Sequence, residues 1–382
     1  MFEKLTQKFL AAHGIARTDA PKLYAESFPY LDLPSLNFQE ATTHILHHLL
    51  GPQVEWKLVP RGILTGNADD TTVVRAVVDH KVYYLKFTKL LRVQLGMLFA
   101  HSFFIDQPHP FCSTATIVSH GLTTIKNKTD YYFMLLEEAQ GEDLIKAFKE
   151  KNDDIIIPYV ETLAKTLAHN HSIDVSKAPA TSKLFYATER TNFHIQRILR
   201  LSNESTDDPS LNFAIQSLLP FLFDQQNQYM KATQSQCFSI CALKNSNLAF
   251  SKQQNKLLMF DTTVFFNSCS PSRSPRWAPE SNFATSFHHL EFLEHYLDLD
   301  PSKMEGYRDH FLRTYYQNIQ HPIMTAQGLN LFTAQAYLES VKNFLAFRNK
   351  TNQFQEKALK MISQFGEMSK RGNPKIGKLL GY

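Results

Sequence analysis

The sequence has few of the features that mark several common classes of protein. Its 382 residues include only four cysteines, and none of them forms a Cys-x-x-Cys pair. This pattern excludes zinc-finger spacing and a dense disulfide framework, and it favours buried free thiols in a reducing compartment. The cysteines are Cys112, Cys237, Cys241 and Cys269.

Long hydrophobic runs are also missing. No stretch approaches the ~18 consecutive apolar residues that a membrane-spanning helix needs, so we expect no membrane span. Residues 1–19 lack the continuous apolar core of a secretion signal. We therefore predict a soluble, cytoplasmic protein; a secretion signal read by a specialised export machine would escape this test.

A strong charge of one sign is absent as well. The 40 lysines and arginines against 36 aspartates and glutamates leave a net charge of +4, which is too small to predict a nucleic-acid partner. Basic residues become dense only near the C-terminus, at Lys370, Arg371, Lys375 and Lys378. We expect a solvated tail there, with contact to an anionic surface as the alternative.

The sequence does contain a clear change of pattern along the chain. Residues 1–50 have helical spacing of apolar residues, and residues 54–87 have the pattern of strands. After two further strands the pattern is mostly helical, unlike the strand–helix alternation of a doubly wound sheet. We predict an α+β fold of two lobes: a helical extension (1–53), a lobe with a five-stranded antiparallel sheet (54–140) and a helical lobe with one small hairpin (141–382).

Three motifs follow one another along the chain. The strand-like KVYYLKF, residues 81–87, places Val82, Tyr84 and Lys86 on one face. An apolar strand in YYFMLLEEAQGEDL, residues 131–144, ends in glutamate and runs through a glycine to a leucine. In FSICALKNSNLAFSKQQNKLLMFDTT, residues 238–263, a polar loop precedes a hairpin whose second strand ends in aspartate.

Together these motifs resemble the two-lobed, protein-kinase-like fold of the aminoglycoside phosphotransferase and choline kinase family, across residues 58–284. The resemblance implies that ATP and Mg²⁺ are the cofactors. Lys86 would hold the nucleotide phosphates, and the backbone near Glu137 and Gly141 would contact adenine. The glycine-loop match, with Gly66 and Asn67, is the poorest. His171, at the end of the helical segment ETLAKTLAHNHSID, takes the place of a structural histidine in the family.

The hairpin motif predicts a metal site. Asn247 and Asp261 fall on the family's metal ligands, and Mg²⁺ requires such hard oxygen donors converging from the two strands. Lys244 is a candidate phosphate contact. The alternative is an ordinary polar hairpin, with an asparagine turn and an aspartate at the end of a strand.

Three positions depart from the family. Ala242 occupies the place of the catalytic aspartate, which orients the acceptor hydroxyl and takes its proton, and no acid occurs between residues 231 and 260. The helix predicted at residues 89–100 offers Gln94 and no glutamate to pair with Lys86. Asn282 replaces the aspartate that anchors the family's catalytic hairpin.

From these departures we predict a pseudokinase that binds metal-nucleotide, with a small-molecule or protein partner on the helical lobe. One alternative is an active phosphotransferase on a small hydroxyl compound, because catalysis in this fold is mostly positioning and electrostatics. Another is a non-phosphoryl transfer, such as nucleotidyl transfer, from the same nucleotide site.

Overall fold

The computed structural model describes residues 30–33, 35–60, 71–89, 94, 97–98, 101, 108–125, 129–173, 209–231, 237, 247–260, 278–320, 324–346, 352–371 and 375–381. The chain divides into two compact units. Unit 1 comprises Met1–Glu142 and Ser246–Ser274, and unit 2 comprises Asp143–Asn245 and Pro275–Tyr382.

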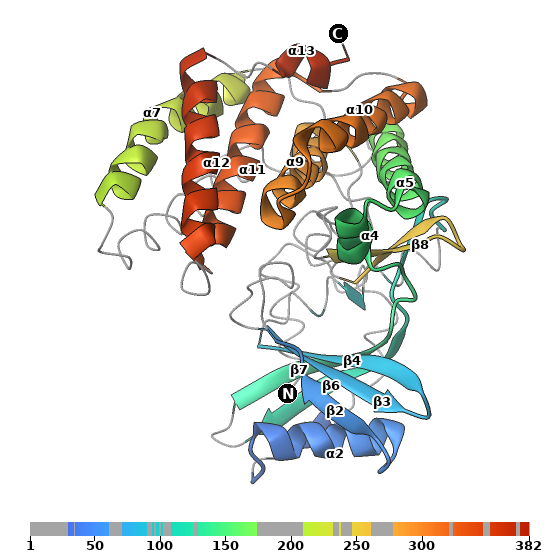
Figure 1. The fold of residues 1–382 in the computed structure, drawn as a ribbon. Helices are drawn as coiled ribbons and strands as arrows, with labels where there is room; N and C mark the ends of the chain where they lie inside the picture. The colour runs from blue at the N-terminus through green and yellow to red at the C-terminus, as the bar shows by residue number, and fades with distance from the viewer. Residues whose placement is uncertain are drawn as a thin grey trace. The chain divides into compact units, whose positions relative to one another are not determined.

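Unit 1 contains a six-stranded sheet in the order β1-β6-β7-β4-β3-β2 (Figure 1). Its strands are β1 (Tyr30–Asp32), β2 (Glu55–Leu58), β3 (Thr71–Val78), β4 (Lys81–Thr88), β6 (Ile117–Ile125) and β7 (Thr129–Glu137). The five strands from β2 to β7 in this sheet pair antiparallel, which confirms the predicted sheet. A tight turn joins β3 and β4, with Asp79 and His80 both at positive φ as such a hairpin requires.

The N-terminal part of the sheet corrects one expectation. Residues 30–32, which we placed in a helical region, form β1 and pair parallel with β6. The later part of the predicted helical region forms α2 (Phe38–Leu50), which begins with a capping box at Asn37 and ends at Gly51. Helix α2 covers one face of the sheet, where its Ile45 and Leu46 pack against buried strand residues.

The small hairpin consists of β8 (Leu248–Ser251) and β9 (Lys256–Met259). It forms a second sheet with β5 (Cys112–Thr114), which pairs parallel with β9. We predicted this hairpin within the helical lobe, but it belongs to unit 1. The physical reason is backbone pairing, because β9 bonds to β5 and Phe250 of β8 bridges to Glu142.

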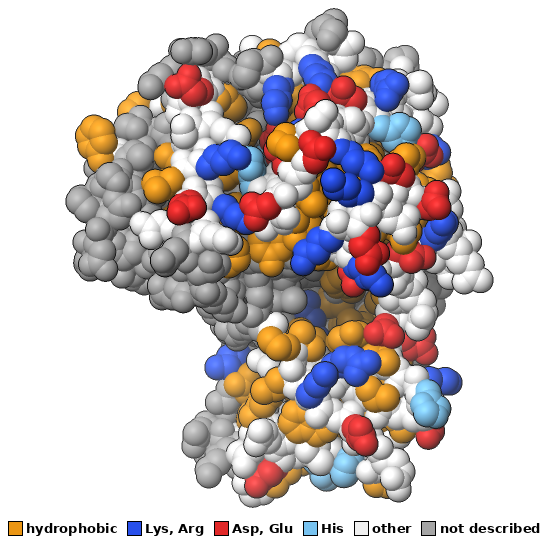
Figure 2. All heavy atoms as spheres, viewed as in Figure 1, with side chains coloured by type: hydrophobic (Ala, Val, Ile, Leu, Met, Phe, Trp, Pro, Cys, Tyr) orange, Lys and Arg blue, Asp and Glu red, His pale blue; other side chains and the backbone are white. Residues whose placement is uncertain are grey.

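Unit 2 is helical in its described part. Its helices are α4 (Leu144–Glu150), α5 (Asp153–Ser172), α7 (Pro209–Lys231), α9 (Pro279–Leu297), α10 (Pro301–Asn318), α11 (Ala326–Ala346), α12 (Asn352–Arg371) and α13 (Ile376–Leu379). Helices α7, α11 and α12 pack together, and α10 packs against α5 and α9 (Figure 1). On the face of this unit drawn in Figure 2, basic side chains lie among acidic ones.

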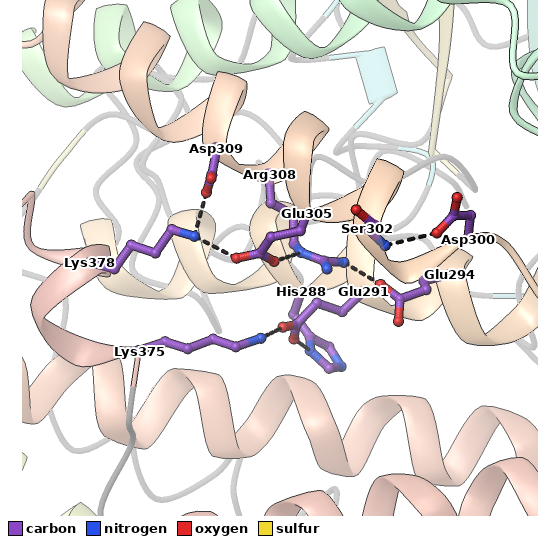
Figure 3. Close-up of polar contacts among 10 residues, drawn as sticks. All are labelled: His288, Glu291, Glu294, Asp300, Ser302, Glu305, Arg308, Asp309, Lys375 and Lys378. Carbon is purple, nitrogen blue, oxygen red and sulfur yellow. Dashed lines mark hydrogen bonds and ion pairs between the residues drawn. The ribbon is translucent and has the colours of Figure 1, made fainter.

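A charged network fixes residues 375–381 to α9 and α10 (Figure 3). Lys375 forms an ion pair with the buried Glu291, and Lys378 forms ion pairs with Glu305 and Asp309. The remaining members are Arg308, 2.7 Å from Glu294 and 2.9 Å from Glu305, and His288, 2.8 Å from Glu291. These two lysines are therefore part of the folded unit, where we had expected a solvated tail.

In the part of the chain that the structure describes, no helix combines the length and the apolar character needed to cross a membrane.

Candidate functional site

The two faces of the main sheet differ in chemistry because side chains alternate along each strand. Leu85 and Phe87 of β4 point to the face that α2 covers, where they are buried. Lys86 points to the opposite face, with Val73 of β3 and Met134 of β7 as its cross-strand neighbours. This alternation puts the predicted phosphate-binding lysine on the face away from α2.

A helical segment lies against this lysine-bearing face. Of its described residues, Gln94, Met97, Leu98 and His101 follow the i, i+3, i+4, i+7 spacing of one helix face. Met97 and Leu98 pack with Met134 and Leu136. His101 Nδ1 lies 3.3 Å from the Thr114 hydroxyl.

The predicted partner of Lys86 has a different set of contacts. Gln94 is buried, and its amide nitrogen donates to the carbonyl oxygens of Gly121 (3.4 Å) and Phe133 (3.2 Å). Among the described residues of this segment, Met97 lies close to Lys86, with its sulfur 3.6 Å from Nζ. Gln94 therefore fixes the segment to the sheet, and its assignment to the nucleotide site stays a prediction.

The end of β7 and the residues after it, 137–142, carry the backbone that the family resemblance assigns to adenine contact, and we call this segment the hinge. The Glu137 side chain is exposed, while its backbone amide donates to Thr116 O (3.0 Å). The next amide, of Glu138, donates to Val82 O (3.0 Å). These bonds fix the start of the hinge to β4 and to the strand connection before β6.

Glu138 also reaches the lysine-bearing face through its side chain. Its Oε1 accepts a hydrogen bond from the Tyr84 hydroxyl at 3.3 Å, and Tyr84 shares that face with Lys86. Burial raises the pKa of Tyr84, the Glu138 carboxylate raises it further, and Arg75, its cross-strand neighbour, opposes both. The Arg75 guanidinium, the Tyr84 phenol and the Glu138 carboxylate thus lie together on this face, two residues along β4 from Lys86.

The hairpin with Asn247 is attached directly to the hinge. The Glu142 amide donates to Phe250 O of β8 at 2.7 Å. Gly141 lies so close to β8 that a Cβ there would be 2.7 Å from the Ala249 Cβ. Only glycine permits this approach without a shift of the hairpin.

The strand register also bears on the metal ligands. The Phe260 amide donates to Asn247 O at 3.0 Å, so Asn247 is paired with the residue that precedes Asp261 in sequence. Asn247 thus offers an amide oxygen, a hard donor that suits Mg²⁺. The roles of Asn247 and Asp261 as metal ligands and of Lys86 as the phosphate contact stay predictions.

The predicted site residues fall into two groups. Lys86, Gln94, Glu137 and Asn247 are described, and all four belong to unit 1. Gly66, Asn67, Ala242, Lys244 and Asp261 lie outside the described residues. The convergence of Lys86, Asn247 and Asp261 on one nucleotide stays a prediction.

Sequence reasoning missed three residues of this face: Arg75, Met97 and Glu138. Met97 is three residues after Gln94, so helical spacing could have found it. Glu138 follows Glu137, and the alternation of side chains in β7 sends the first of the two acids to the α2 face. Arg75 required the β3–β4 register, which pairs it with Tyr84.

Two residues that the family resemblance singled out, His171 and Asn282, are buried in unit 2. His171 is bonded through Nδ1 to the Tyr315 hydroxyl at 2.7 Å, and burial lowers its pKa to about 3. Asn282 is buried in α9. Two residues before it, Glu280 Oε1 accepts bonds from the Thr325 amide (2.8 Å) and hydroxyl (2.9 Å) at the start of α11, and burial raises the pKa of Glu280. These groups hold helices of unit 2 together.

No family model matches the sequence, and no curated protein matches it either. Solved structures with similar folds share little sequence identity with this chain. The amicoumacin kinase hAmiN in complex with AMP-PNP, Ca²⁺ and Ami has a TM-score of 0.55 and 13% identity, over 87% of this chain and 94% of that one. A thermostable mutant of aminoglycoside phosphotransferase APH(4)-Ia, in a ternary complex with AMP-PNP and hygromycin B, has a TM-score of 0.52 and 12% identity, over 87% and 99%.

A third structure is the GDP complex of aminoglycoside 2'-phosphotransferase-IIIa, with a TM-score of 0.50 and 12% identity over 87% of this chain and 99% of that one. At such identities the likeness concerns the fold alone. The strands, the hinge, helix α5, the hairpin and the later helices follow one another in the order that the motifs predicted. The chain therefore has the two-lobed, kinase-like fold of the aminoglycoside phosphotransferases.

Proposed function

We propose that this protein binds a nucleotide with Mg²⁺ at the lysine-bearing face of unit 1, and that ordinary phosphotransfer is absent or severely weakened. The observation that carries the proposal is the attachment of the Asn247 hairpin to the hinge through Glu142 and Phe250. This attachment fixes a metal-ligand candidate to the segment that would contact the base. The chain's fold neighbours include proteins solved with AMP-PNP and with GDP, so the fold accepts both purines.

The sequence of the segment that packs beside Lys86 supports the weakened chemistry, because residues 89–100 contain no glutamate. In active kinases a glutamate from the neighbouring helix pairs with this lysine. Here the segment presents the thioether of Met97 to Lys86, and the Gln94 amide nitrogen bonds to sheet carbonyls. Ala242 adds the loss of the general base, which typically contributes ~10²–10⁴ in rate.

Nucleotide binding is tested by substituting the predicted metal ligand. Asp261→Ala should weaken Mg²⁺–ATP binding in calorimetric titration by about tenfold or more, because a carboxylate ligand of the ion is lost. Asp154→Ala, at an exposed position in α5, is the matched control and should bind as the wild type does. Equal affinity in the Asp261 variant would show that this residue only ends a strand.

The missing base is tested by restoring it. Ala242→Asp should raise ATP turnover by about 5- to 150-fold, or ~1–3 kcal/mol in barrier, because the acceptor hydroxyl regains a proton acceptor. The gain is limited because Met97 and Asn282 remain as they are. Wild-type turnover of a small hydroxyl compound at a typical kinase rate of ~1–100 s⁻¹ would contradict the pseudokinase and favour the active phosphotransferase.

A further inference from the structure

The lysine-bearing face of unit 1 holds a second group of polar side chains whose chemistry the phosphate and metal contacts do not use. Arg75 and Tyr84 are cross-strand neighbours, as are Tyr84 and Leu136. The Tyr84 hydroxyl donates to Glu138 at the start of the hinge. We call Arg75, Tyr84 and Glu138 the polar triad.

The triad lies at a definite place relative to Lys86. Tyr84 and Lys86 are two residues apart on β4, which is about 7 Å along the strand. The triad is on the hinge side of Lys86, because Glu138 belongs to the segment that follows β7. A nucleotide whose phosphates meet Lys86 and whose base meets the hinge therefore brings its base to the triad.

The charges of the triad distinguish the two purines. A carboxylate only accepts hydrogen bonds, and a guanidinium only donates them. Guanine offers O6 and N7 as acceptors and its 2-amino group as a donor, whereas adenine replaces O6 by an amino donor. Guanine N1 also carries a hydrogen, while adenine N1 is an acceptor that a carboxylate repels.

We propose that the polar triad selects guanine over adenine, with Glu138 accepting from N1–H and the 2-amino group and Arg75 donating to O6. The Tyr84 hydroxyl holds the carboxylate on this face. The proposal rests on the proposed function, since it assigns the base of the same nucleotide. Arg75, Tyr84 and Glu138 are thus specificity-determining residues, and the ligand is a guanine nucleotide.

The test is calorimetric titration of the full-length protein with the Mg²⁺ complexes of GTP, ATP and ITP. GTP should bind about tenfold or more tightly than ATP, as one well-placed pair of hydrogen bonds to a base provides. ITP keeps N1–H and O6 but lacks the 2-amino group, so its affinity should lie between the two. Glu138→Gln should reduce the GTP-to-ATP ratio severalfold, and Glu55→Gln, at an exposed position on β2, should leave it unchanged.

Three outcomes overturn the proposal in different ways. If wild-type protein binds ATP as tightly as GTP, nucleotide binding stands and base selection fails. If GTP is preferred but Glu138→Gln leaves the ratio unchanged, the carboxylate only ties the hinge to β4. If neither nucleotide binds, the proposed function fails and the inference fails with it.

Discussion

At the scale of single residues, burial determines the protonation state of His171. Its ring lies at the end of α5, bonded to Tyr315, and burial lowers its pKa to about 3 from an ordinary 6.5. The unfolded chain takes up this proton below pH 6.5, while the folded chain does so only near pH 3. The stability that the neutral ring provides is therefore complete above pH 6.5 and declines as the pH falls toward 3.

This pH dependence is tested by measuring the free energy of unfolding from pH 7 to pH 4. His171 should contribute a slope of up to ~1.4 kcal/mol per pH unit below pH 6.5. His171→Gln removes this titration, so its stability should fall less steeply with acid than that of the wild type. His48→Gln, exposed on α2, is the control and should follow the wild-type curve. Parallel curves for wild type and His171→Gln would contradict the assignment.

At the scale of elements, the contact between the hinge and β8 depends on the absence of a side chain at Gly141. Gly141→Ala would place a Cβ 2.7 Å from the Ala249 Cβ and 3.1 Å from Phe250 O. We predict a loss of ~1–3 kcal/mol in the free energy of unfolding, because neither β8 nor the hinge can move without breaking the Glu142–Phe250 bond.

A second glycine provides the matched control for this prediction. Gly306 lies inside α10, and a Cβ there would meet no atom within 4 Å. Gly306→Ala should therefore raise the free energy of unfolding by ~0.5–1 kcal/mol through helix propensity. Denaturant titration of both variants should move their midpoints in opposite directions. A common direction would show that close approach is not what Gly141 provides.

The elements also show how far the sequence predicts the fold. The strands β3, β4 and β7 were predictable because their β-branched and apolar runs are long. Strand β1 was not predictable, because Tyr30–Asp32 is too short to show a periodic pattern of apolar residues. Its pairing with β6 makes this segment a strand. Within the site, spacing identified Gln94 but not its contacts, because only the packed segment shows that Met97 meets Lys86.

At the scale of the whole molecule, ion pairs between residues distant in sequence hold residues 375–381 in place. Lys375→Ala would remove the ammonium group that pairs with the buried Glu291 and leave the hydrogen bond of this carboxylate to the His288 ring. We predict a loss of ~1–3 kcal/mol in the free energy of unfolding, less than the ~3–5 kcal/mol of a fully buried pair because Lys375 is 41% exposed.

An exposed ion pair in unit 2 provides the control. Lys146 and Glu150 lie 3.9 Å apart with both side chains more than half exposed, so Lys146→Ala should change stability by less than ~0.5 kcal/mol. Thermal unfolding of the two variants should separate these effects clearly. Similar small shifts for both would mean that water already screens Glu291.

The same network sets an order of events during synthesis. Lys378 follows its partner Glu305 by 73 residues, and Lys375 follows Glu291 by 84. At translation rates of about 5–20 residues per second, the acids of α9 and α10 exist for roughly 4–17 s before their lysines are made. During that interval Glu291 lacks Lys375 and Glu305 lacks Lys378, so the packing of α9 and α10 gains the stabilisation of these ion pairs only after the ribosome has added the two lysines.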